Sequence, residues 1–309
     1  MKPFDPAHWA LILGGSSGFG LAVADKVSRH GMNVAIVHRD RRGAMGRIQP
    51  AFDAIAARGV GFRTWNLDAL SVEGREKVLT ELAATMGTGR VRLLLHSIAF
   101  GNLRPLAVTP PQPEPLTALA TALEVPAERV REAVAALTRT GHPTLAALAP
   151  AATLDPAAGV LEEEDFARTI HAMGTSLITW VQALLRHKLF ASDARVVALT
   201  SEGNRVAWPG YAAVAAAKGA LESAVRSLAA ECALHGIRTN VVQAGVTETP
   251  ALSLIPGHQR ILAAAQARNP FRRMTTPEDV AAFICLLATD EAAWVTGAHI
   301  MVDGGEHLG

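Results

Sequence analysis

The chain has 309 residues, half of them apolar, and a formal charge of +1 at pH 7. This length and apolar content favour one large α/β domain over residues 1–309 that carries an insertion, rather than two domains. A charge so close to zero provides no long-range field that would attract nucleic acid or an anionic membrane surface, so neither is expected as a partner.

The cysteines, histidines and apolar runs narrow the class of protein further. Cys232 and Cys285, the two cysteines, are too few for a disulfide framework, and no carboxylate–histidine cluster indicates a metal site. No run of about 18 apolar residues is present, and residues 1–6 lack the apolar core of a signal peptide. We therefore expect a soluble cytoplasmic protein without a metal, a membrane span or a removable leader.

Apolar runs alternate with amphipathic stretches along the whole chain. Most of the apolar runs are continuous, as in strands that are buried on both faces of a parallel sheet. We predict strands at 10–13, 33–37, 61–65, 92–96, 195–200, 238–243 and 299–302, and helices at 20–30, 44–58, 71–86, 165–188, 211–235 and 277–289. This order predicts a Rossmann-type doubly wound parallel sheet of about seven strands with helices on both faces.

The segment after the first predicted strand is rich in glycine and serine. Its glycines allow a tight turn and let backbone amides approach a pyrophosphate, and the following helix directs its positive dipole end toward that anion. The segment lies between a strand and a helix, which is the context that dinucleotide binding requires. The cofactor-binding residues expected here are Gly14, Ser16, Ser17, Gly18, Phe19 and Gly20.

Basic residues follow the second predicted strand. In this architecture an acidic residue at that point binds a ribose diol, whereas arginine accommodates a 2′-phosphate. His38 and Arg39 occupy the turn, with Arg41–Arg42 behind them, and Asp40 comes too late to take the acidic role. The pattern favours NADPH over NADH.

The turn after the third predicted strand adds two candidates for the cofactor site. Asn66 and Leu67 are expected near the adenine, and Asp68 replaces Asn66 if the loop is longer.

Residues from about 104 to 163 interrupt the alternation of strands and helices. The region is rich in Pro and Ala, and it contains one predicted helix that starts at Pro126, ends at Gly141 and carries Val130, Val134 and Leu137 as its apolar stripe. Because it leaves the sheet at the carboxyl edge, it is either a wall of the substrate site or a surface excursion or subunit contact.

Tyr211 is the only tyrosine, and Lys218 follows seven residues later on a predicted helix. Seven residues make almost two helical turns, so both side chains can lie on one face. The phenol can stabilise negative charge on a substrate oxygen, while the ammonium holds the cofactor ribose and lowers the phenol pKa. The pair is therefore a candidate catalytic site.

These motifs together resemble the short-chain dehydrogenase/reductase superfamily over nearly the whole chain apart from the insertion. The stretch 240–249 is similar to the family's loop after the sixth strand, and 301–305 is similar to its closing strand. The resemblance implies that Thr249 contacts the cofactor phosphates, and that Val246 and Thr247, which follow Gly245, approach the nicotinamide.

Within that superfamily the chain resembles the enoyl-acyl-carrier-protein reductases. Common members space tyrosine and lysine four apart, but here position 215 is Ala and the spacing is seven. The stretch 96–100 is similar to the subgroup's fourth-strand motif, which implies that Ser97, Ile98 and Ala99 line the cofactor site. Asp165–Phe166 and Ser176–Leu177 are similar to its next helix.

Two features depart from many members of that subgroup. Ser201 stands where they carry a second tyrosine, and the stretch 199–203 resembles the NADPH-dependent branch instead. Ser201 also fits ketoreductases, whose serine holds a carbonyl. The length of the insertion is the second departure, since neither group requires it.

The resemblance implies NADPH-dependent reduction of trans-2-enoyl thioesters, with Tyr211, Lys218 and Ser201 as catalytic residues and acyl-carrier protein or coenzyme A as the carrier. One alternative is reduction of a 3-oxoacyl thioester or another carbonyl on the same scaffold. A second is a cofactor-binding regulatory protein with little turnover. The long helices 165–188 and 211–235 resemble those that pair across two-fold axes in relatives, which implies a homotetramer.

Overall fold

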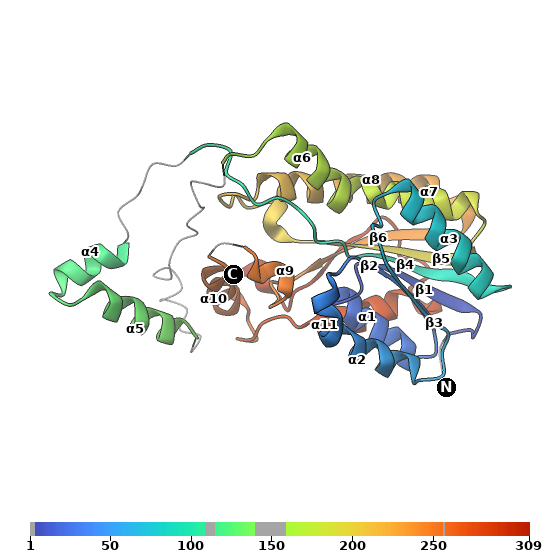
Figure 1. Ribbon diagram of the computed structural model, residues 1–309, viewed down its shortest axis with the longest axis horizontal. Coiled ribbons are helices and arrows are strands. Elements are labelled where there is room, and N and C mark those ends of the chain that lie inside the picture. Colours follow the sequence, from blue (N-terminus) through green and yellow to red (C-terminus); the bar gives the residue numbers. More distant parts are fainter. Residues whose placement is uncertain (1–3, 109–114, 140–158, 256) are drawn as a thin grey trace.

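A computed structural model describes residues 4–108, 115–139, 159–255 and 257–309 of the chain. Its centre is a seven-stranded sheet in the order β3-β2-β1-β4-β5-β6-β7, with every neighbouring pair parallel (Figure 1). The strands are β1 His8–Leu13, β2 Asn33–His38, β3 Phe62–Asn66, β4 Arg90–His96, β5 Phe190–Thr200, β6 Ile237–Ala244 and β7 His299–Val302. The predicted fold class is confirmed, including the number of strands.

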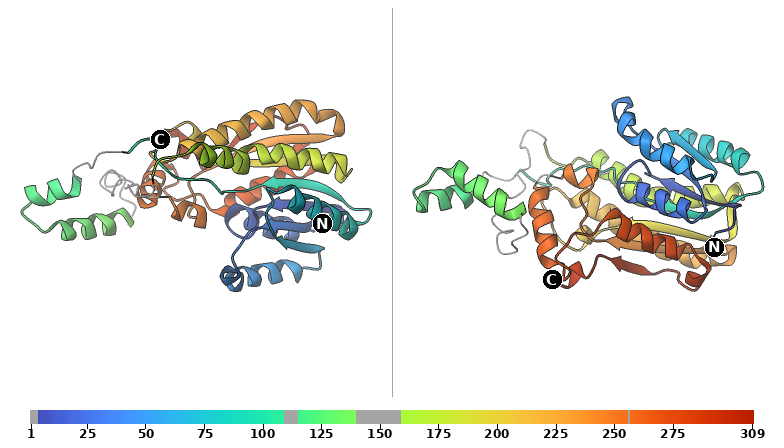
Figure 2. Two further views of the ribbon diagram at one scale, coloured as in Figure 1. Left: turned by 45° about the horizontal axis from the view of Figure 1, so that its top comes forward. Right: turned by 90° about the horizontal axis from the view of Figure 1, so that it is seen from below.

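Helices cover both faces of this sheet (Figures 1 and 2). One face packs against α1 Gly18–Arg29, α2 Met45–Ala56 and α11 Pro277–Leu287, and the other against α3 Val72–Met86, α7 Ser176–Arg186 and α8 Ala212–Glu231. Alternate residues of the strands β1 to β6 enter the two apolar cores, and β7 contributes to one of them. This burial on both faces explains why the strands appear in the sequence as unbroken apolar runs.

Local signals set where several of these helices begin. Ser71 accepts a hydrogen bond from the Gly74 amide at 2.9 Å and caps α3. At α11, Thr276 and Asp279 form a reciprocal capping box, and Pro277 occupies the first turn, where its missing N–H costs nothing. Such caps satisfy amides that would otherwise lack partners at the start of a helix.

The predicted helix 165–188 is two helices joined by a wider turn. It consists of α6 Glu163–Ile170, a π-helical turn at His171–Thr175, and α7. π-turns of this kind frequently occur at functional sites. The π-turn is packed closely on α8, since a side chain at Gly174 would meet the backbone carbonyl of Ala217.

The insertion contains two described helices, α4 Pro115–Ala122 and α5 Ala127–Arg139, of which only the second was predicted. They project together from the body of the molecule in all the views of Figures 1 and 2. Val130 and Val134 are buried against α4, but Leu137 is 42% exposed, so the predicted stripe is shorter than expected. The predicted helix end at Gly141 lies outside the described residues. So do residues 1–3, the first half of the segment that lacks the apolar core of a signal peptide.

Neither a membrane span nor a metal site was expected from the sequence. No helix there is long and apolar enough to cross a membrane. Among the same residues, no cluster of three or more His, Cys, Asp or Glu side chains is arranged to hold a metal ion.

Candidate active site

A cavity of about 660 Å³ opens at the carboxyl ends of the strands. Its walls come from the segments that follow β1, β2, β3, β4, β5 and β6, together with α8. The order of the strands reverses between β1 and β4, and ligands of open α/β sheets bind at such a switch point. The cavity is therefore the candidate site on structural grounds.

The glycine loop forms one end of this cavity. Gly14 has a φ of +85°, and a Cβ there would lie 2.6 Å from the Ser97 carbonyl oxygen, so both the turn and its contact with β4 require glycine. Ser17 stands at the N-cap of α1 without any side-chain capping bond, and the first turn of α1 contains no acidic residue. The amides at this helix start are thus free to bind an anion, which fits a cofactor pyrophosphate.

Gly20 belongs to the same loop but does not line the cavity. A side chain at this position would overlap the backbone of Gly14, so Gly20 keeps the helix packed against the loop. Its role is in packing rather than in contact with a ligand.

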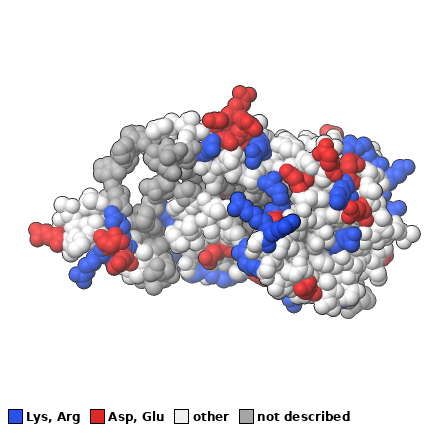
Figure 3. All heavy atoms as spheres, viewed as in Figure 1, with Lys and Arg blue, Asp and Glu red and all other residues white. Residues whose placement is uncertain are grey.

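The turn after β2 brings charged side chains to the cavity. His38, Arg39 and Asp40 all line it, whereas Arg41 and Arg42 do not. Arg39 pairs with Asp68 at 3.2 Å, and its guanidinium lies 4.7 Å from the centre of the Phe100 ring. Basic side chains gather near the middle of the face shown in Figure 3.

Asn66 also lies outside the cavity, while Leu67 and Asp68 line it. The Asn66 amide instead donates to the Asp40 carbonyl and accepts from the Asp40 amide, both at 3.0 Å. Asn66 therefore braces the turn that presents Arg39, and of the two residues considered for this place only Asp68 reaches the cavity.

Tyr211 directly precedes α8 and lines the same cavity. Its ring packs edge-on against Trp208 at 5.3 Å and directly against Gly203, where any side chain would overlap it. Ser201 also lines the cavity, and its buried Oγ has no hydrogen-bond partner of good geometry. The Ser201 hydroxyl is therefore available to bind a ligand atom or a water molecule in the cavity.

Burial raises the pKa of Tyr211, and the nearby Ser201 hydroxyl offsets the rise only in part. We expected Lys218 to lower the phenol pKa, but burial raises this pKa, and the group that opposes the rise is Ser201. Tyr211 is consequently protonated at neutral pH and can act as a hydrogen-bond donor.

Lys218 lies in α8 and borders the same cavity, as the seven-residue spacing predicts. Its Nζ donates to the Leu199 carbonyl at 2.8 Å. Burial lowers the pKa of Lys218 to about 8, against the opposing effect of Glu222. The side chain is thus held in one place and still carries its proton at neutral pH for most of the time.

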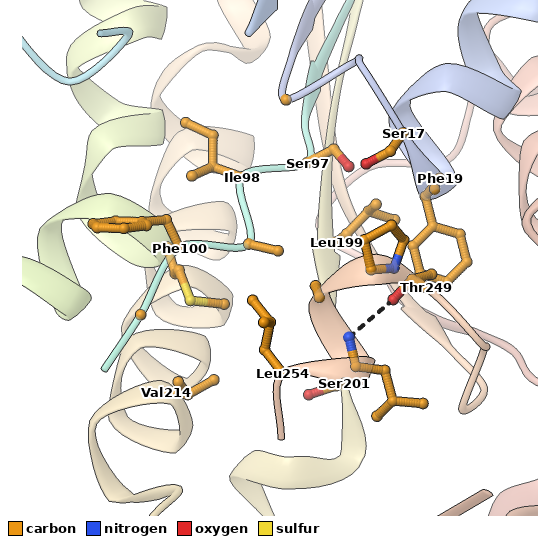
Figure 4. A pocket seen from close by; sticks show the side chains of 18 of the residues that line it. Ser17, Phe19, Ser97, Ile98, Phe100, Leu199, Ser201, Val214, Thr249 and Leu254 are labelled. Atoms are coloured by element: carbon orange, nitrogen blue, oxygen red, sulfur yellow. Dashed lines mark hydrogen bonds between the residues drawn. The ribbon is translucent and has the colours of Figure 1, made fainter. Parts of the chain in front are cut away.

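The segment after β6 carries Gly245, Val246, Thr247 and Thr249, all of which line the cavity. Thr249 caps the short helix α9 Pro250–Ser253 by accepting from the Leu252 amide at 3.2 Å. The dashed line in Figure 4 marks this bond beside Phe19.

The sequence did not indicate Glu306, which binds the backbone of the segment after β6. Its Oε2 accepts from the Val246 amide at 3.0 Å, and its Oε1 accepts from Arg268 at 3.0 Å. Burial raises the pKa of Glu306 to about 7. A lone glutamate after the closing strand carries no sequence signal of such a role.

His96, which the sequence indicated only as part of a motif, is buried next to Ser97 and contacts the end of the π-turn. Its Nε2 lies 2.8 Å from the Ser176 Oγ, which donates to the Ala172 carbonyl at the π-turn. Burial, followed by the nearby Lys218 charge, lowers the pKa of His96 to about 3, so this histidine is neutral.

Apolar side chains form the other end of the cavity. Figure 4 shows Ser17 and Ser97 facing each other where the glycine loop meets β4, with Phe100, Val214 and Leu254 on the opposite side. Helix α10 His258–Arg268 adds Ile261 to this apolar wall. None of the described residues of α4 or α5 lines the cavity, so the two readings of the insertion stay open.

The structure thus brings together nearly all of the predicted site residues. Those that line one cavity are Gly14, Ser16, Ser17, Gly18, Phe19, His38, Arg39, Leu67, Ser97, Ile98, Ala99, Ser201, Tyr211, Lys218, Gly245, Val246, Thr247 and Thr249. The arrangement offers an anion cradle, a buried phenol–lysine pair and an apolar wall within one continuous space.

Known proteins are similar to part of the chain. Protein FixR of Bradyrhizobium diazoefficiens is 35% identical over 174 residues, which cover 52% of this chain and 61% of FixR. The enoyl-[acyl-carrier-protein] reductase [NADH] FabI of Bacillus subtilis is 34% identical over 120 residues, or 39% and 46% of the two chains. The chain thus spans about half the length of these curated relatives.

Solved structures match over almost the full length. The enoyl-[acyl-carrier-protein] reductase (NADH) of Aquifex aeolicus superposes with a TM-score of 0.71 at 23% identity, covering 98% of this chain and 97% of its own. A short-chain dehydrogenase of Burkholderia cenocepacia in complex with NADP gives 0.69 at 21% identity, covering 97% and 98%. At these identities the likeness supports the fold.

A family model described as enoyl-(acyl carrier protein) reductase matches residues 127–307, which is more than half of the chain. The chain therefore belongs to this family, one of the short-chain dehydrogenase/reductase families of oxidoreductases.

Proposed function

We propose that this protein reduces the carbon–carbon double bond of trans-2-enoyl thioesters with NADPH. The observation that carries the proposal is the placement of Tyr211 and Lys218, seven residues apart, on one cavity that also has an apolar wall. The family to which the chain belongs supports the same chemistry.

The glycine loop, Arg39 and Lys218 would hold the cofactor, whose nicotinamide supplies the hydride that adds to the β-carbon. As that carbon gains hydride, negative charge moves to the thioester oxygen, and the protonated Tyr211 phenol donates a hydrogen bond to it. The raised pKa of Tyr211 suits this role because the phenol keeps its proton. The α-carbon then takes a proton from solvent, which completes the addition of two hydrogens.

The choice of NADPH rests on Arg39. Its guanidinium lies at the cavity beside the glycine loop and has one carboxylate partner, Asp68. A planar guanidinium suits bidentate contact with a 2′-phosphate. We expect kcat/KM to be higher with NADPH than with NADH.

One rival activity has an observation in its favour. The buried Ser201 hydroxyl, which has no hydrogen-bond partner of good geometry, can orient a ketone or a 3-oxoacyl thioester for reduction, with Tyr211 as the proton donor. The seven-residue spacing is the feature that favours the enoyl substrate over the carbonyl substrate.

The deciding experiment compares NADPH oxidation with a trans-2-enoyl thioester and with its matched 3-oxoacyl thioester. Faster oxidation with the enoyl substrate is expected, and Tyr211→Phe should lower kcat at least about 100-fold while the NADPH Kd stays close to that of the wild type. Faster oxidation with the keto substrate would assign carbonyl reduction instead. Tight NADPH binding without turnover of either substrate would assign a regulatory role.

The acyl carrier and the assembly are also proposals. We expect an acyl group carried on acyl-carrier protein or coenzyme A, and a homotetramer built through α7 and α8.

A further inference from the structure

A carboxylate that the sequence did not single out binds both ends of the loop after β5. Glu222, in α8, accepts at the same oxygen, Oε1, from the Thr200 hydroxyl at 2.8 Å and from the Asn204 side-chain amide at 2.7 Å. These donors stand on the two sides of the segment 201–203. One oxygen therefore ties both ends of this segment to the helix that carries Lys218.

That segment contains the groups that contact Tyr211. Ser201 borders the cavity beside the phenol, and Gly203 lies so close that a side chain there would overlap the Tyr211 ring. A shift of the segment would thus move Ser201 and release one side of the ring. Glu222 itself does not line the cavity, so it can act only through these neighbours.

The charged groups around Glu222 come from three elements. His299 of β7 lies 3.8 Å from its second oxygen, and Arg205, after the loop, lies 3.4 Å from the same histidine nitrogen. Within α8, Arg226 and Lys218 flank it by one turn each, and Arg226 adds to the lowering of the His299 pKa. The Glu222 side chain is only 12% exposed, so little water screens its charge.

Lys218 also experiences that charge. It lies one helical turn before Glu222, and the carboxylate opposes the fall in the Lys218 pKa that burial causes. His96 also interacts with Lys218, and burial keeps this histidine neutral. Glu222 is thus the anion that favours the ammonium form of Lys218.

We propose that Glu222 is a positioning residue for the reaction: its carboxylate holds the 200–204 segment against Tyr211, and its charge keeps Lys218 an ammonium that can bind the cofactor. The proposal rests on the proposed function for the roles of Tyr211 and Lys218. The hydrogen bonds and the burial on which it is built do not depend on which acyl substrate is used.

Two variants separate the two parts of the proposal. Glu222→Gln keeps an oxygen that can accept from Thr200 and Asn204 but removes the charge, whereas Glu222→Ala removes both. Glu231→Gln is the matched control, because Glu231 is an exposed glutamate at the end of the same helix.

Hydrogen–deuterium exchange on the protein without cofactor tests the positioning. Glu222→Ala should speed exchange of the amides at 201–205 by about tenfold or more, and Glu222→Gln and the control should exchange like the wild type. In turnover at pH 6, where Lys218 keeps its proton even without the Glu222 charge, Glu222→Ala should lower kcat by about 10- to 100-fold with little change in the KM for NADPH. Folded Glu222→Ala with wild-type exchange and wild-type kcat would overturn the positioning role.

The pH dependence of the NADPH Kd, followed by fluorescence between pH 6 and 10, tests the charge. Wild-type affinity should fall as Lys218 loses its proton, and in Glu222→Gln the midpoint should move down by about 0.5–1 pH unit. An unchanged midpoint in Glu222→Gln would overturn this part. If the wild type binds NADPH but reduces neither thioester, the proposed function fails, while the exchange and binding measurements still decide the role of Glu222.

Discussion

Tyr211 owes its chemistry to neighbours that the chain brings from an earlier loop. Gly203 and Trp208 both lie against its ring, and burial keeps the phenol protonated. The ring can hold one orientation because Gly203 has no side chain. Residue identity at position 203 therefore affects how the Tyr211 ring is held, even though Gly203 does not line the cavity.

Replacing Gly203 with alanine should move the phenol out of place. We expect Gly203→Ala to lower kcat by about 10- to 100-fold, because the added methyl group would overlap the Tyr211 ring. Steady-state kinetics with an NADPH binding measurement checks this, and the NADPH Kd should change little. Gly46→Ala, where a new methyl group meets nothing, is the control; equal kcat values for the two variants would contradict the expectation.

Glu306 makes the stability of the protein depend on pH. Its ordinary carboxyl pKa of 4.5 is raised to about 7, first by burial and also by Glu202 and Asp303, while the Val246 amide and Arg268 oppose the rise. Below pH 4.5 the carboxyl is neutral in both the folded and the unfolded state. Between 4.5 and about 7 only the unfolded chain ionises, so the free energy of unfolding falls as pH rises through this window.

Glu306→Gln should remove that dependence. At about 1.36 kcal/mol per pH unit, the loss in the wild type is at most roughly 3 kcal/mol, and it ends above about pH 7, where both states are ionised. Urea unfolding at pH 5, 6, 7 and 8 measures it. The difference between wild type and Glu306→Gln should change between pH 5 and 7 and stay level above; parallel curves would show that Glu306 ionises normally.

At the scale of elements, the start of α6 fixes the segment that leaves β4. Asp165, in the first turn of α6, accepts from Asn102 at 2.7 Å and from Arg104 at 2.5 Å. The two ends of the insertion are joined as well, because the Leu161 amide donates to the Pro105 carbonyl at 2.8 Å. We call these contacts of Asp165 and Leu161 the strap. Residues 100–103, in the segment that follows β4, line the apolar end of the cavity.

Loosening the strap should weaken substrate binding more than chemistry. Asp165→Asn loses the charge that holds Arg104, so we expect the KM for the acyl substrate to rise by about 3- to 10-fold and kcat to stay within about twofold. The Tm should fall by about 2–4 °C. Glu164→Gln, an exposed neighbour in the same turn, is the control. An unchanged KM in Asp165→Asn would mean that the wall does not depend on this strap.

At the scale of the whole molecule, the two apolar cores lie on opposite faces of one sheet, and the site lies at one edge of that sheet. The helices α7 and α8 cover one of these faces and lie at the surface of the single chain (Figure 1). Exposed positions of α8 include small residues such as Gly219, Ser223 and Ser227, which allow another helix to approach closely.

The proposed homotetramer has a direct test. Four chains of 32.5 kDa have a mass of about 130 kDa, which light scattering coupled to size exclusion would measure. A mass of about 65 kDa would indicate a dimer, which would not use all of the subunit contacts proposed for α7 and α8. A mass near 32.5 kDa would rule out assembly through α7 and α8.

The sequence by itself determined the fold class, the seven strands and slightly fewer than half of the residues that line the cavity. Apolar runs and the glycine loop are local signals, and the Tyr211–Lys218 spacing is set by helix geometry, so none of them needs distant contacts. Only the tertiary structure decided that Asn66 braces a turn, that burial raises the Tyr211 pKa, and that Glu222 and Glu306 support the site. These outcomes depend on burial and on contacts between segments far apart in the chain, and a single sequence records neither.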